Sequence, residues 1–171
     1  MVLEKLAKSM WSLAYAVQGV VLTFLMLSVT VIVFIQVILR YVLHAPLMGI
    51  EELVLFPAIW LYMLGGANAS LERNHIQCNV ITVYIKNPVA LSLLNLLKSI
   101  ISLSVCLWLA YWAYKYFMYS LKVWKLSNLL YIPLFFGESS LFICLVLMSI
   151  YTSVELCDHL IKVRSLLRER G

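Results

Sequence analysis

The chain has 171 residues, of which 64% are hydrophobic and only 12% are charged. Soluble domains are about 45–50% apolar and about 25% charged, so no globular core of this length could hide so much apolar surface. The net charge of +5 comes from basic residues that flank apolar segments, and it therefore indicates membrane anchoring and argues against nucleic-acid binding. The sequence predicts an all-α integral membrane protein with a single membrane domain and four transmembrane helices.

The first predicted span covers about residues 10–40. No Asp, Glu, Lys or Arg occurs between Lys8 and Arg40, a stretch much longer than the apolar part of a signal peptide, so we expect an uncleaved helix. A bilayer needs only about 20 apolar residues. This helix should therefore tilt or protrude into an interface.

A short connection with Pro46 and Gly49 leads to the second span, at about 52–72. Glu51 and Glu52 stand at its start, where acidic side chains suit the positive end of the helix dipole. Residues 76–86 are too short to cross the membrane, but their apolar positions share one helical face. They predict a short interfacial amphipathic helix between spans two and three.

The third span is predicted at about 91–121, with Lys98 and Lys115 close enough to its ends to reach the headgroups. The fourth is predicted at about 133–160 and begins at a proline, which suits a first helical turn. The basic tail from Lys162 is expected to lie on the membrane surface. If both termini lie on one side, nine of the 13 lysines and arginines lie there too, which predicts cytoplasmic termini.

The chemistry of a membrane enzyme is missing from the sequence. The histidines, His44, His75 and His159, fall at the edges of the predicted spans rather than inside them, where haem ligands would be needed. The four cysteines form no Cys-x-x-Cys pair, and there is no phosphate-binding loop or hydrolase motif. We therefore predict no enzymatic activity, no cofactor and no metal site.

Two polar residues could serve transport in principle. Asn68 is the clearest polar residue inside a span, and a lone Asn more often forms hydrogen bonds between helices than ligates an ion. Glu138 falls in the first turn of the last helix, where compensation of the dipole or pairing with a loop is favoured over a transport role. The central parts of the spans otherwise lack the ionisable residues that an ion path requires.

Three features suggest packing or docking surfaces. Small residues recur at four-residue spacing, Gly65 with Ala69 and Gly66 with Ser70, which allows a second helix to approach closely. That helix could belong to this chain or to a partner, and the sequence does not choose.

The second feature is Arg40 facing Glu51 and Glu52 across a short connection, either as an ion pair or as separate headgroup anchors. The third is an aromatic face on the third span that carries Trp108, Trp112 and Tyr119. A lipid belt is favoured there over a docking surface.

One stretch resembles a known family. It carries Arg40-Tyr41 before Pro46-Leu47, then Glu51-Glu52-Leu53, then Gly65-Gly66-Ala67 and Arg73-Asn74-His75-Ile76, and Tyr131-Ile132-Pro133 follows later. The order and spacing of these motifs resemble the small membrane subunit of tripartite ATP-independent periplasmic (TRAP) transporters, the DctQ-type small permease. Three positions depart from the family pattern: Gly49 replaces an aromatic residue, Asn79 replaces an acid, and Arg73 stands one residue late.

The resemblance implies an accessory scaffold subunit in the bacterial inner membrane. Its expected partners are a large multi-span subunit, a periplasmic substrate-binding protein and membrane lipids. The transporter would be sodium-driven and import an organic acid, such as a C4-dicarboxylate or a sialic acid. The alternative is an autonomous four-helix transporter that acts as a homodimer.

The charge distribution gives a topology prediction. Cysteines introduced at Ala45 and Ser127 should react with an impermeant thiol reagent in intact cells, because both positions lie in connections predicted to be outside. Labelling of cysteines at Ser9 and Ser165 instead would show the inverted orientation.

Overall fold

The computed structural model describes residues 2–44, 49–72 and 88–168 of the chain. This part contains four long helices: α1 (Val2–Tyr41), α2 (Gly49–Leu71), α4 (Pro88–Val123) and α5 (Phe135–Arg168). Each is long and apolar enough to cross a membrane. The predicted all-α architecture with four membrane helices is confirmed.

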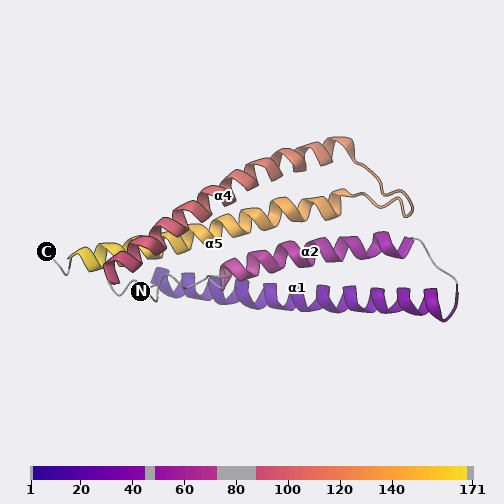
Figure 1. Ribbon diagram of the computed structural model, residues 1–171, viewed down its shortest axis with the longest axis horizontal. Coiled ribbons are helices and arrows are strands. Elements are labelled where there is room, and N and C mark those ends of the chain that lie inside the picture. Colours follow the sequence, from indigo (N-terminus) through magenta and orange to yellow (C-terminus); the bar gives the residue numbers. More distant parts are fainter. Residues whose placement is uncertain (1, 45–48, 73–87, 169–171) are drawn as a thin grey trace.

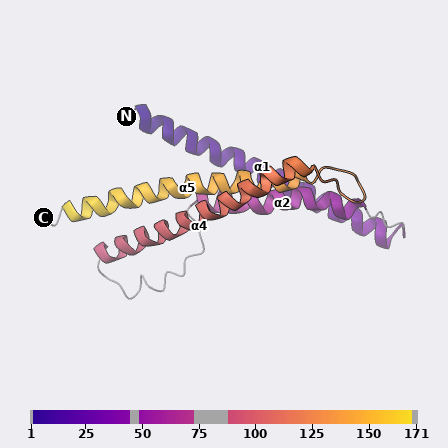
Figure 2. The ribbon, with the colours of Figure 1, turned by 90° about the horizontal axis from the view of Figure 1, so that it is seen from above.

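The helices lie side by side in the order α4, α5, α2, α1 (Figure 1). Both termini lie at one end of this arrangement, and the α1–α2 and α4–α5 connections lie at the opposite end, which we call the connection end. In Figure 2 the first turns of α1 stand apart from the other helices. With 40 residues, α1 far exceeds the 23 of α2, and its excess length projects toward the termini.

A row of small side chains lets α4 approach α5 closely. The buried residues of α4 recur at every seventh position: Ser92, Ser99, Cys106, Ala113 and Ser120. A seven-residue repeat keeps one stripe of a helix facing its neighbour along its whole length. Without a hydrophobic driving force inside the bilayer, this close contact is what holds two apolar helices together.

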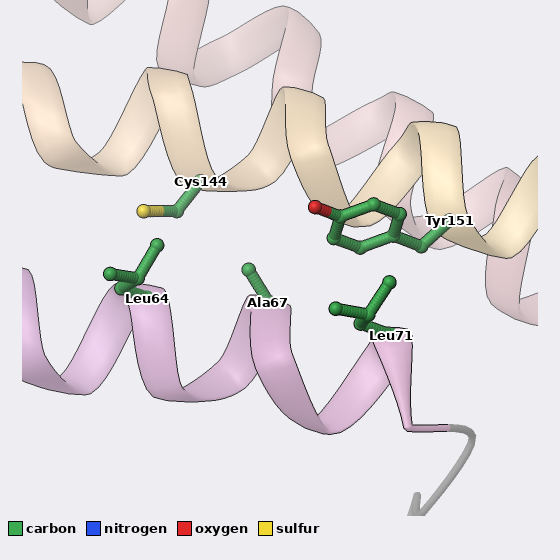
Figure 3. Close-up of a cluster of buried hydrophobic side chains, with 5 residues drawn as sticks. All are labelled: Leu64, Ala67, Leu71, Cys144 and Tyr151. Carbon is green, nitrogen blue, oxygen red and sulfur yellow. The ribbon is translucent and has the colours of Figure 1, made fainter. Parts of the chain in front are cut away.

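The seam between α2 and α5 contains the best-buried apolar cluster. Leu64, Ala67 and Leu71 of α2 lie opposite Cys144 and Tyr151 of α5 (Figure 3). Ala67 has no exposed surface and Cys144 is only 1% exposed. Small side chains at the centre therefore give this seam its close packing as well.

Residues 162–168 of the basic tail continue α5 without a break, and their position at the membrane surface stays a prediction. The predicted interfacial helix at 76–86 lies outside the described residues.

The small residues at every seventh position of α4, which we call the heptad of small residues, give a stability prediction. Ser99→Leu should destabilise the protein by about 1–3 kcal/mol, because a large side chain forces α4 and α5 apart. Ser104→Leu is the matched control, since Ser104 is exposed on the same helix and a leucine there meets lipid. Unfolding free energies measured in detergent with increasing dodecyl sulfate compare the two, and equal losses would contradict the role of the heptad.

Candidate functional site

The connection between α4 and α5 is folded back on itself. The N–H of Ser127 donates to the carbonyl of Ile132 and the N–H of Leu134 to that of Lys125, both at 2.9 Å. Trp124 and Tyr131 adopt positive φ angles of 46° and 54°, which turn the chain sharply. The resulting hairpin presents the backbone N–H groups at its tip toward α2.

The carboxylate of Glu52 occupies the tip of this hairpin. It accepts hydrogen bonds from the N–H groups of Leu129 and Leu130, each at 3.1 Å on Oε2, and from the hydroxyl of Ser127. Hydrogen bonds to a carboxylate are among the strongest that backbone N–H and hydroxyl groups form. Glu52 thereby ties the first turn of α2 to the connection of the other helical hairpin.

Glu138 forms a second polar link, between α5 and α4. It lies in the first turn of α5 and accepts hydrogen bonds from the hydroxyls of Tyr116, at 2.7 Å, and Ser120 on α4. Its position suits the positive end of the helix dipole, as the sequence favoured. Its partners, however, lie on helix α4 and not in a loop.

A pocket of about 390 Å³ opens between these two carboxylates. Gly137 and Leu141 of α5 form its floor, and Phe56 of α2 and Tyr116 of α4 stand on either side. The remaining lining comes from α2, from the connection and from Glu138 of α5: Glu52, Leu55, Ile59, Lys125, Leu126, Ser127, Asn128, Leu134 and Glu138. Beside the pocket, the indole N–H of Trp60 donates to the carbonyl of Phe136 at 2.8 Å and fixes α2 against α5.

The predicted ion pair between Arg40 and the glutamates of α2 is not formed. Glu51 accepts a hydrogen bond from the side chain of Gln36 at 3.2 Å, and Glu52 binds the connection instead. The guanidinium of Arg40 lies over the ring of Tyr41, 5.6 Å from its centroid. For Glu52, the α4–α5 connection, far away in sequence, takes the place of Arg40 because it offers several donors in one place.

Asn68 does not join two helices in the described structure. Its amide donates to Glu72 at 3.1 Å, one turn further along the chain. Gln18 of α1, in contrast, joins two helices, because its amide donates to the hydroxyl of Tyr151 of α5 at 2.6 Å. Ser70 and Thr152 also join α2 to α5, with hydroxyl oxygens 3.4 Å apart.

The small residues of α2 do not all face the same surroundings: some pack against α5, and others face open space. A Cβ on Gly66 would lie 3.9 Å from the sulfur of Met148 on α5, whereas one on Gly65 would meet nothing within 4 Å. Gly66 and Ser70 therefore pack inside this chain, and Gly65 keeps open space beside it.

The aromatic face of α4 points outward. Its residues Trp108, Trp112 and Tyr119 are 68%, 53% and 61% exposed, as both a lipid belt and a docking surface require.

Three predicted residues, Pro46, Arg73 and His75, lie outside the described residues. Several residues that form the site escaped the sequence analysis: Gln18, Gln36, Tyr116, Ser120 and Ser127. The seven-residue repeat that ends at Ser120 was visible in the sequence and could have identified the α5-facing stripe of α4. Nothing in the sequence pairs Glu52 with Ser127, which are 75 residues apart.

These contacts define a small helical membrane protein whose polar side chains join helices and connections. Within residues 2–44, 49–72 and 88–168, no three His, Cys, Asp or Glu side chains are grouped as metal ligands would be.

Residues 29–161 match the family model described as "Tripartite ATP-independent periplasmic transporters, DctQ component". The chain belongs to this family and is a component of a TRAP transporter, and the family is one of transporter components and not of enzymes. A search of curated proteins finds no match.

The link between Glu52 and Ser127 gives a second stability prediction. Ser127→Ala should cost about 1–3 kcal/mol and Glu52→Ala more, because Glu52→Ala also leaves the N–H groups of Leu129 and Leu130 without an acceptor. The double variant should cost less than the sum of the two. Unfolding free energies in detergent measure this coupling, with Arg40→Ala as the control.

Additive losses of unfolding free energy for Glu52→Ala and Ser127→Ala would contradict the link.

The same geometry changes the choice of labelling position in the connection, because Ser127 is only 6% exposed. Tyr131, 72% exposed in the same connection, is the better site for a reporter cysteine.

Proposed function

We propose that this chain is the scaffold subunit of a TRAP transporter and carries no substrate or ion path of its own. Membership of the DctQ family supports assignment to a TRAP transporter. The distribution of charged residues supports the scaffold role. Four long stretches of the helices, 11–39, 53–71, 99–114 and 139–154, contain no Asp, Glu, Lys, Arg or His. Transport paths for ions or organic anions need such groups deep in the membrane.

The polar groups inside these stretches serve packing. Gln18 with Tyr151 and Ser70 with Thr152 join helices through neutral hydrogen bonds. The carboxylates of Glu52 and Glu138 stay at the connection end, where Glu52 ties α2 to the α4–α5 connection and Glu138 ties α5 to α4. Such a protein provides a fixed membrane surface against which a moving transport domain can work.

We further propose that the transporter is a sodium symporter in the bacterial inner membrane. A large multi-span subunit would hold the substrate and sodium sites, and a periplasmic binding protein would deliver an organic acid, of the C4-dicarboxylate or sialic acid type. The excess of lysine and arginine at the end with the termini supports cytoplasmic termini. The connection end then faces the periplasm, where the binding protein docks.

This function predicts that the chain alone is inactive. Reconstituted by itself in liposomes with an inward sodium gradient, it should take up no radiolabelled organic acid, because the centres of its spans offer no charged path. Liposomes that also contain the large subunit, supplied with the binding protein outside, should show uptake. Robust uptake by this chain alone would contradict the scaffold role.

A further inference from the structure

The pocket at the connection end has the shape of a docking groove. Leu55, Phe56 and Ile59 of α2 form one wall, and Tyr116 of α4 stands on the other side, with α5 beneath. Leu55 is 56% exposed, so this wall is accessible to a partner from outside the chain. Residues 125–128 of the α4–α5 connection close the groove at its polar end.

The charges in this groove do not balance. Its lining contains two carboxylates, Glu52 and Glu138, and one ammonium group, that of Lys125, which leaves a formal charge of −1. Both carboxylates accept hydrogen bonds from hydroxyl or N–H groups. Among the described residues, neither has a basic side chain within ion-pair distance. What the groove lacks is therefore a cation, and not further neutral donors.

We propose that this groove receives a lysine or arginine side chain from the large membrane subunit, with its apolar neighbours packed against Leu55 and Phe56. The proposal rests on the scaffold function above and adds the place and the chemistry of the contact. A single basic side chain brings the formal charge to zero. Partly dehydrated charge pairs of this kind fix the register of an interface and exclude wrong partners.

The position of the groove favours a membrane partner over a soluble one. Its apolar wall of Leu55, Phe56 and Ile59 lies on α2, a helix apolar enough to cross the membrane, and such a wall suits the apolar surface of another membrane protein better than the polar surface of a soluble one. A zwitterionic lipid headgroup is a weaker fit, because it would bring a phosphate close to two carboxylates and leave the charge of −1 in place.

The first test compares charge variants in the co-expressed complex. Glu138→Gln keeps the shape of the side chain and one carbonyl acceptor for the hydroxyl of Tyr116 or Ser120 but removes the charge, and it should weaken association with the large subunit about tenfold. Glu51→Gln is the matched control at the same end, because Glu51 does not line the groove, and it should leave association unchanged. Affinity is measured by titrating the detergent-solubilised subunits.

The second test fills the groove. Leu55→Trp should weaken association to a similar extent, while Leu53→Trp, on the same helix and also exposed but outside the groove, should not. Neither substitution touches a buried residue, so both variants should fold, and thermal unfolding of the isolated chain checks this. Association of Leu55→Trp and Glu138→Gln equal to that of the unchanged chain would overturn the proposal.

The third test identifies the occupant. A photoreactive amino acid at position 55 should cross-link to a segment of the large subunit that contains a lysine or arginine, and one at position 53 should not. Exchanging the charges, with Glu138→Lys here and glutamate in place of the cross-linked basic residue, should restore association. Adducts with lipid alone would overturn the proposal.

These outcomes distinguish failure of the groove proposal from failure of the scaffold function on which it rests. If the unchanged chain binds the large subunit but the groove variants bind equally well, only the groove proposal fails. If the unchanged chain does not bind the large subunit at all, the scaffold function fails with it.

Discussion

The carboxylate of Glu52 holds two helical hairpins together at a single point. It stands in the first turn of α2 and accepts the N–H groups of Leu129 and Leu130 in the α4–α5 connection. Hydrogen bonds to a carboxylate are among the strongest that N–H groups form, so this contact fixes the tip of the connection against α2. The groove lies beside this contact, and the same contact occupies the carboxylate that was a candidate partner for Arg40.

Below that point the helices are held by close packing and not by charge. The heptad of small residues on α4 and the cluster of Ala67 and Cys144 between α2 and α5 bring backbones together, which compensates for the missing hydrophobic drive between helices in lipid. Neutral hydrogen bonds, such as that from Gln18 to Tyr151, fix the register of α1. The result is a layer of helices with broad apolar faces left open, as befits one component of a larger membrane assembly.

The positions of the charged side chains along the spans also bear on whether this chain has a transport path of its own. Charged side chains gather toward the helix ends, and the centres of the four spans carry no charged group of the kind that a path for an ion or an organic anion requires. The proposed scaffold role needs no such groups. It needs a fixed surface, and the polar links at the connection end join the helices that would form it.

The sequence by itself determined the class of the protein: composition and the long apolar runs predict four membrane helices, and the motifs around Arg40, Glu51 and Glu52 pointed to the family. These properties are local, because hydropathy and turn residues act within one segment. The partners of Glu52, Glu138 and Gln18 were decided only by the tertiary structure, since each contact joins a helix to a different helix or to the connection of the other helical hairpin. Arg40 shows the physical reason: a nearby opposite charge predicted an ion pair, but a distant connection offered the carboxylate of Glu52 several well-placed donors at once.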